Sequence, residues 1–150
     1  MSDGYCNSRV VALAADGTFQ FAWGSAGVGP GQFRLPHGIA RDAQGRIHVA
    51  DRENGRVQLF SSRGQYLTQW RPDGATVAVG DVAVSSAGLI YVSLWDGRDE
   101  VVVLTPALQP IASIPVAGRR IAPHALAIDG DSVMYWADPD GRSVVQLKRR

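Results

Sequence analysis

Short apolar runs of about five residues recur along the whole chain, and turn-forming residues separate them. No segment keeps the 3.6-residue period of an amphipathic helix, so the pattern predicts strands throughout. We expect about thirteen strands, at 9–13, 18–23, 37–41, 46–50, 56–60, 65–70, 79–84, 89–93, 100–104, 110–114, 125–128, 133–137 and 143–147.

The apolar runs belong to a longer repeat. Ile39 is followed 43 residues later by Val82, and His37 is followed 87 residues later by His124, about two repeats on. A repeat of this length with four short strands is typical of the blades of a β-propeller. The predicted fold class is therefore all-β, with about three blades of a propeller ring.

The strand pattern predicts a partial blade at 1–24, full blades at 35–70 and 79–115, and a partial blade at 123–150. A propeller closes a ring of roughly four to eight blades, which protects its sheet edges. Three blades and a piece would leave two edges open. We therefore expect a fragment of a longer protein or half of an assembly, for example a homodimer formed through the open edges.

Four polar or aromatic residues map to one face of such a propeller. His37 and His124 enter inner strands, while Tyr5 and Arg52 lie in turns between second and third strands. In a six-bladed ring, histidines on alternate blades would be two members of a three-fold set around the axis. Three imidazoles with an open position suit a catalytic zinc ion. The plainer alternative is that the imidazoles cap strands, Arg52 forms a salt bridge between blades and Tyr5 packs.

Other repeated residues favour structural roles. Asp3, Asp51 and Asp138 recur at one position of the repeat, and we expect them to brace turns. His48 stands between two aliphatic residues and is expected to be an ordinary strand residue. Trp23 and Trp70, which close equivalent strands, are expected to pack in the core or between blades.

Composition narrows the partners. Hydrophobic residues make up 45% and charged residues 19% of the chain, and the formal net charge of +1 gives no reason to expect nucleic acid or a membrane as partner. No apolar run reaches the length of about 18 residues that a membrane helix needs. The first residues lack the charged and apolar regions of a signal peptide. Cys6 is the single cysteine, so an internal disulfide is excluded.

Several strings of residues resemble one family. They are Asp-Gly-Tyr-Cys-Asn-Ser-Arg at 3–9, Pro-Gly-Gln-Phe at 30–33, Pro-His at 36–37 and Ala-Asp-Arg-Glu-Asn-Gly-Arg at 50–56. The strings resemble NHL-repeat propellers and, more closely, the peptidyl-α-hydroxyglycine α-amidating lyase family. The resemblance is dense from 2 to 60, weakens from 71 to 122 and returns at 123–124.

The resemblance implies a six-bladed propeller that splits a C-terminal α-hydroxyglycine into a peptide amide and glyoxylate. It implies a zinc ion held by three histidines, two of which correspond to His37 and His124. A tyrosine and an arginine near that metal correspond to Tyr5 and Arg52. Zinc lowers the pKa of a bound hydroxyl. Tyr5 would be the base and Arg52 would bind the glycine carboxylate.

The chain also departs from this family. The blades that should carry the third histidine are absent, and Ala125 replaces the acidic residue linked with a structural calcium, so calcium is not supported. Cys6 should pair with a cysteine in an earlier blade, and His48 and Leu59 replace a second disulfide. Those disulfides imply an exported parent protein, secreted or periplasmic. A two-fold copy of this chain would complete a ring without restoring three histidines.

Three functions remain open from the sequence. The first is a zinc-dependent lyase of this type, incomplete in this chain. The second is a non-catalytic NHL module that binds a peptide or a protein. The third is a half-propeller that pairs through its edges and has no site. A fold shared by enzymes and binding modules does not decide among them.

Overall fold

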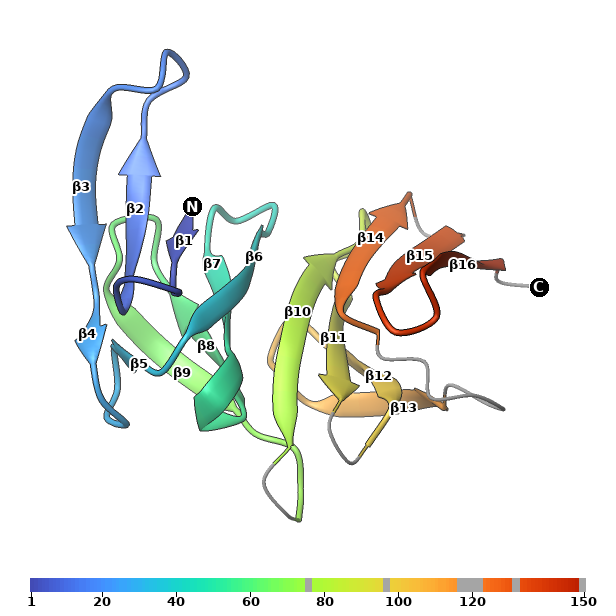
Figure 1. The fold of residues 1–150 in the computed structure, drawn as a ribbon. Helices are drawn as coiled ribbons and strands as arrows, with labels where there is room; N and C mark the ends of the chain where they lie inside the picture. Colours follow the sequence, from blue (N-terminus) through green and yellow to red (C-terminus); the bar gives the residue numbers. More distant parts are fainter. Residues whose placement is uncertain (75–76, 96–97, 116–122, 131–132, 149–150) are drawn as a thin grey trace.

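The computed structural model describes residues 1–150 except 75–76, 96–97, 116–122, 131–132 and 149–150. Four antiparallel sheets follow one another, and the strands of each are in chain order (Figure 1). The sheets comprise β1 (Ser2–Asp3), β2 (Arg9–Leu13) and β3 (Phe19–Trp23); β6 (Pro36–Arg41), β7 (Ile47–Asp51), β8 (Arg56–Phe60) and β9 (Tyr66–Trp70); β10 (Ala78–Val84), β11 (Ile90–Trp95), β12 (Glu100–Leu104) and β13 (Pro110–Pro115); and β14 (Ala125–Asp129), β15 (Val133–Asp138) and β16 (Ser143–Lys148).

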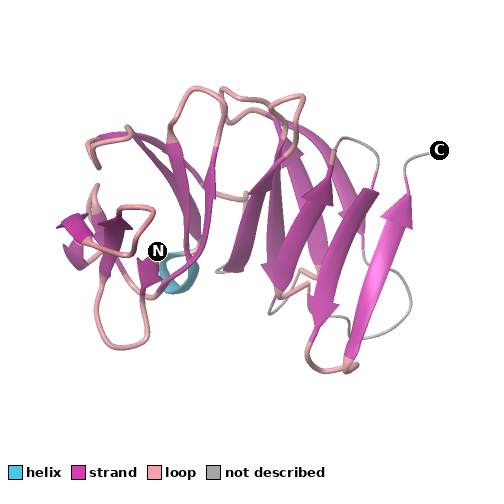
Figure 2. Ribbon diagram, turned by 90° about the horizontal axis from the view of Figure 1, so that it is seen from above, coloured by secondary structure: helices cyan, strands magenta, loops and turns pink. Residues whose placement is uncertain are grey.

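The described sheets form an open arc of blades and not a closed ring (Figure 2). The innermost strands β6, β10 and β14 lie side by side, with β10 between the other two. The structure confirms the all-β propeller fold and the predicted strands to within two residues at each end. The described residues include no helix with the length and apolar character needed to cross a membrane.

Three short features were not predicted. Strand β1 pairs with β2, so the first sheet has three strands and not the two that the sequence pattern predicted. The glycine-rich loop contains the parallel pair β4 (Ser25–Ala26) and β5 (Gln32–Phe33), and a 3-10 turn, η1 (Arg52–Asn54), follows β7. Each segment has only two or three residues, which is too short for an alternating pattern to reveal.

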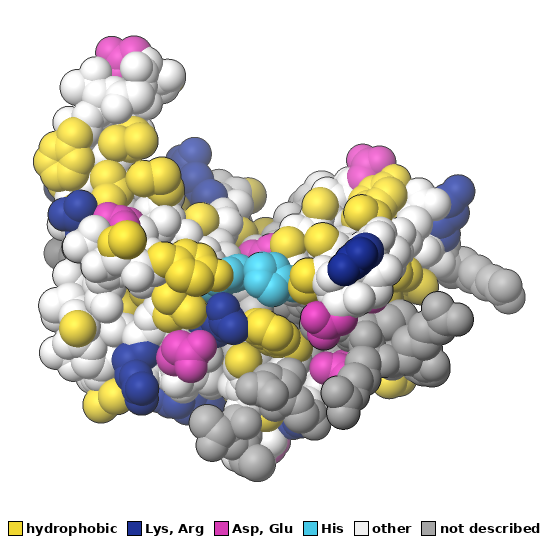
Figure 3. All heavy atoms as spheres, viewed as in Figure 1, with side chains coloured by type: hydrophobic (Ala, Val, Ile, Leu, Met, Phe, Trp, Pro, Cys, Tyr) yellow, Lys and Arg dark blue, Asp and Glu magenta, His cyan; other side chains and the backbone are white. Residues whose placement is uncertain are grey.

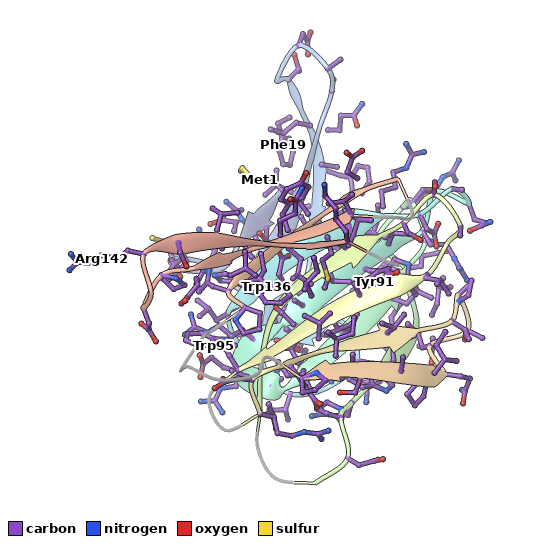
Figure 4. All side chains as sticks on the ribbon, turned by 90° about the vertical axis from the view of Figure 1, so that its right-hand side faces the viewer. Met1, Phe19, Tyr91, Trp95, Trp136 and Arg142 are labelled. Atoms are coloured by element: carbon purple, nitrogen blue, oxygen red, sulfur yellow. The ribbon has the colours of Figure 1, made fainter. Side chains whose placement is uncertain are left out.

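Apolar side chains fill the spaces between neighbouring sheets. Val10, Phe33, Val49 and Phe60 form a buried cluster between the first two sheets, and Trp23 packs on Phe60 with 5.9 Å between ring centroids. A larger cluster joins the second and third sheets and includes Trp70 at its margin. Trp136 and Tyr91 lie between the last two sheets (Figure 4). These contacts confirm that Trp23 and Trp70 pack between blades.

The recurring aspartates brace turns, as predicted. The Oδ1 atom of Asp51 accepts a hydrogen bond from the backbone N–H of Arg34, and its Oδ2 accepts from Arg56 and Asn54. Asp3 accepts from the side chains of Arg9 and Asn7, which hold its pKa below the ordinary value. Asp138 accepts from the backbone N–H of Gly141.

A buried arginine fastens the glycine-rich loop to the second sheet. The side chain of Arg56 is 1% exposed and forms an ion pair with Asp51, with 2.7 Å between Nε and Oδ2. Its terminal nitrogens donate to the Gln69 side chain and to three loop carbonyls, those of Val28, Gly29 and Gln32, at 2.8–2.9 Å. Because five hydrogen bonds use all the donors of the guanidinium group, the charge is buried without an unpaired N–H.

His48 is a buried strand residue whose pKa is lowered. Its side chain is fully buried, and its Nε2 lies 3.1 Å from Oδ2 of Asp42, which also binds Arg46. Burial lowers the pKa of His48 below 6.5, and the hydrogen bond with Asp42 only partly opposes this effect. The folded protein therefore holds the neutral imidazole at pH values where the unfolded chain already binds a proton.

We expect this difference to make the protein less stable as the pH falls below about 6.5. The contribution is fully present above the pKa of the unfolded chain and is lost as the pH drops through the folded pKa of His48. Urea unfolding between pH 8 and pH 5 would measure it, with His48→Leu as the comparison. As the pH falls, the wild-type protein should lose more unfolding free energy than His48→Leu loses. A constant difference would contradict the assignment.

Candidate functional site

Three blades place the predicted site residues on one face of the arc. Tyr5 follows β1, His37 lies in β6, Arg52 is in η1, and His124 directly precedes β14. The rings of His37 and His124 are 4.8 Å apart between centroids and nearly perpendicular. The Tyr5 hydroxyl lies 3.4 Å from Nε2 of His37. Histidine side chains are visible at the middle of this face in the space-filling view (Figure 3).

The bonding of His37 fixes its tautomer. Its Nδ1 lies 2.7 Å from the carbonyl oxygen of Gly80, and a carbonyl can only accept a hydrogen bond. The hydrogen of the neutral ring is therefore on Nδ1. The lone pair on Nε2 is left facing the Tyr5 hydroxyl and can serve as a metal ligand.

His124 is held as a neutral imidazole. Burial lowers its pKa below 6.5, and the nearby positive charge of Arg52 lowers it further. The backbone N–H of His124 donates to the carbonyl of Ala137, which ties this residue to β15. A neutral imidazole at pH 7 is the form that binds a metal ion.

Arg52 is stacked on an aromatic ring of the next blade. Its guanidinium carbon lies 4.5 Å from the ring centroid of Trp95, and the Trp95 ring lies 5.5 Å from that of His124. Glu53 is 3.4 Å from Nε of Arg52 but does not satisfy hydrogen-bond geometry, so this buried Nε has no hydrogen-bond partner. Among the described residues, Arg52 therefore contacts the next blade through a cation–π interaction with Trp95.

Trp95 is the site residue that the sequence interpretation missed. It ends β11 and stands 43 residues after Arg52, one repeat length, so the repeat itself was the signal that could have found it. Its place on the site face depends on the packing of two blades, because it contacts Arg52 of the blade before. The side chain forms an aromatic wall between Arg52 and His124.

A partly buried carboxyl group lies near the two histidines. Asp81 lies at the register shift of β10, and its Oδ2 accepts a hydrogen bond of 2.8 Å from the backbone N–H of Leu126. Burial raises the pKa of Asp81 above its ordinary value, and the N–H groups of Leu126 and Val82 oppose this effect.

The two imidazoles fit as two of the three ligands of a zinc ion. His37 donates its other ring N–H to a backbone carbonyl, which is the usual support of a zinc-bound histidine. Within the described ranges, no group of three or more His, Cys, Asp or Glu side chains could hold a metal ion. A further ligand would have to come from outside this set.

The remaining features of the resemblance lie away from these histidines. Cys6 is an exposed free thiol. His48 and Leu59 are directly opposite each other on β7 and β8, as the two halves of a cross-strand disulfide would be, but neither is a cysteine. A cavity of about 390 Å³ between the last two sheets is lined by apolar side chains such as Tyr91 and Met134, and it includes none of the site residues.

Comparison with known proteins agrees with this geometry. The NHL repeat family matches residues 33–60. The virginiamycin B lyase of Staphylococcus aureus has a similar fold, with a TM-score of 0.71 and 9% identity over 94% of this chain and 48% of that one. The chain carries an NHL repeat and folds as consecutive blades of a β-propeller.

Curated relatives of this NHL-repeat chain include amidating proteins. It is 39% identical to peptidyl-glycine alpha-amidating monooxygenase A of Xenopus laevis, over 96% of this chain and 17% of the relative. It is 30% identical to NHL repeat-containing protein 3 of Homo sapiens, over 96% and 44%. It is 27% identical to a protein of Caenorhabditis elegans named probable peptidyl-alpha-hydroxyglycine alpha-amidating lyase, over 99% and 45%. The chain spans less than half the length of each of these relatives.

Proposed function

We propose that this site acts in the cleavage of peptidyl-α-hydroxyglycine to a peptide amide and glyoxylate. The observation that carries the proposal is the meeting of Tyr5, His37 and His124 from three different blades. Relatives named for amidation support the same reaction class. His37 and His124 would hold a zinc ion, which when bound makes a neighbouring hydroxyl group more acidic.

The chain's own residues account for the remaining roles. The Tyr5 oxygen removes the proton of the substrate hydroxyl, the C–N bond breaks, and the hydroxyl carbon becomes the aldehyde carbon of glyoxylate. The amide nitrogen takes up a proton and leaves as the peptide amide, so no water is consumed. Arg52 lies on the same face, and its terminal N–H groups can bind the carboxylate of the glycine unit in a bidentate pair.

A peptide-binding module without catalysis is the second candidate. Tyr5 is 75% exposed, and Arg52 is stacked on Trp95 at the same face, which gives an aromatic surface and a cation for a peptide C-terminus. At this site the described residues place two imidazoles, those of His37 and His124, and not three. This candidate predicts binding of a peptide carboxylate with no release of glyoxylate.

A direct assay separates the two candidates. The 150-residue chain would be incubated with zinc and N-benzoyl-α-hydroxyglycine. Glyoxylate release would be compared with that from the same substrate and zinc in buffer without the protein. We expect bound zinc and glyoxylate release above the buffer rate, and both should be lost in His37→Ala. The control is His48→Leu, which removes the chain's third histidine away from the site.

The result that would overturn the lyase proposal is also defined. Saturable binding of benzoylglycine to the folded chain, with no glyoxylate formed at any zinc concentration, would assign the site to peptide binding. Circular dichroism of both variants would show that each is folded before its zinc content is compared.

A further inference from the structure

The inner strand of the third blade is irregular where it passes the two histidines. Strands β10 and β11 pair regularly up to Val79 and again from Val82, and the register shifts between these residues. Inside the shift, the backbone N–H of Asp81 donates to the Ser93 hydroxyl at 2.7 Å. Such bulges redirect backbone and side-chain groups, and they are common beside active sites.

The first residue of the bulge binds His37. The carbonyl of Gly80 is turned towards the second blade and accepts from Nδ1 of His37. A Cβ atom at position 80 would lie 2.9 Å from the Ser93 hydroxyl and 3.2 Å from the carbonyl oxygen of His124. Glycine lets the backbone pass this close to both neighbours without displacing either of them.

The second residue of the bulge binds the strand that follows His124. The Asp81 carboxylate accepts from the backbone N–H of Val82 through Oδ1 and from that of Leu126 through Oδ2, each at 2.8 Å. On its other side it packs on Gly38, where a Cβ atom would overlap both Oδ1 and Cα of Asp81. The carboxylate is thus wedged between the residue after His37 and the second residue after His124.

We propose that Gly80 and Asp81 position the two histidines: the Gly80 carbonyl sets the tautomer and ring orientation of His37, and the Asp81 carboxylate sets the distance between β6 and β14 and so between His37 and His124. The consequence for metal binding rests on the proposed function. The positioning itself is a property of the metal-free chain. Asp81 is a positioning residue, because it acts through the histidines.

The test compares Asp81→Asn with Asp129→Asn in the full chain. Asparagine has nearly the same shape, but its amide has one acceptor oxygen, so one of the two N–H groups now bound would face an NH₂ group. Asp129 ends β14, the strand that contains Leu126, and it is exposed, which makes it a matched control. Zn²⁺ is the metal probe, and hydrogen exchange and imidazole ¹⁵N spectra of the metal-free chain are the other readouts.

We expect the wild-type spectrum to show His37 with its hydrogen on Nδ1. Asp81→Asn should accelerate exchange of the Leu126 amide, shift the His124 ring resonances and weaken Zn²⁺ binding about 10–100-fold, a usual effect of losing support behind the ligands. Asp129→Asn should change none of these. If Asp81→Asn does not fold, Ser93→Ala takes its place in the test. This milder change removes only the bond to the Asp81 N–H and should give the same effects at smaller size.

Two results would overturn the proposal. One is a wild-type His37 with its hydrogen on Nε2. The other is a folded Asp81→Asn protein with a lower melting temperature but unchanged His124 resonances and Leu126 exchange, which would reduce Asp81 to a structural role. Neither readout requires turnover or bound metal. A failed glyoxylate assay would therefore remove the lyase proposal and leave the positioning intact.

Discussion

Replacing Arg56 with methionine is expected to lower the free energy of unfolding by about 3–5 kcal/mol, the usual effect of removing one partner of a buried ion pair. The variant would leave the fully buried carboxylate of Asp51 without its cation. It would also strip donors from the carbonyls of Val28, Gly29 and Gln32. Urea unfolding followed by circular dichroism would measure the change.

The first blade offers a matched control for this experiment. Arg9 and Asp3 form the equivalent arginine–aspartate pair, with 2.9 Å between Nε and Oδ2, but their side chains are 48% and 23% exposed. Arg9→Met should therefore lower the unfolding free energy by only about 0–1 kcal/mol. Equal losses in the two variants would show that burial does not set the strength of the Arg56 network. Arg56→Lys, which keeps the charge but loses the forked geometry, should fall between them.

The second large effect is expected for Tyr5→Phe. If the Tyr5 oxygen takes the substrate proton, glyoxylate release should fall about 10²–10⁴-fold, the usual contribution of general acid–base catalysis. Zinc content should stay unchanged, because the change removes no imidazole. Stability should shift by less than about 0.5 kcal/mol, because the Tyr5 side chain is exposed and its hydroxyl makes only a long contact, 3.4 Å to His37, among the described residues. Glyoxylate release and zinc content would be measured on the same samples.

Tyr66→Phe is the control for this prediction. Tyr66 lies in β9 and packs on Phe60, far along the blade from the inner strand β6. Its hydroxyl should not affect turnover. Full activity in Tyr5→Phe would rule out Tyr5 as the base. The assignment of His37 as a metal ligand would still be tested separately by the zinc content of His37→Ala.

The position of Arg52 depends on a brace that differs between blades. In the second blade, Asp51 holds the turn that presents Arg52, and the N–H groups of Arg52 and Glu53 bind the carbonyls of Leu35 and Arg34. These bonds connect the turn to the segment that leads into His37. The Arg56 network anchors the same segment through Gln32. Loss of Arg56 should therefore alter the position of Arg52 at the site as well as destabilise the fold.

The sequence by itself determined the fold class, the strand positions and the face on which the site lies. Strand positions follow from local alternation, and the 43-residue repeat places equivalent residues on equivalent blades. His37 and His124 could therefore be assigned to the inner strands of alternate blades, and Asp51 to a turn, before any contact was known. Strand β1 and the β4–β5 pair escaped because two residues carry no detectable period.

Only the tertiary structure decided how the residues of different blades meet. The 4.8 Å approach of His37 and His124, the Gly80 carbonyl behind His37 and the stacking of Arg52 on Trp95 each join separate sheets. Such contacts depend on sheet twist, on the bulge at Gly80–Asp81 and on the space that glycine leaves. These quantities are set by the packing of blades against one another, which a strand pattern within one blade does not encode.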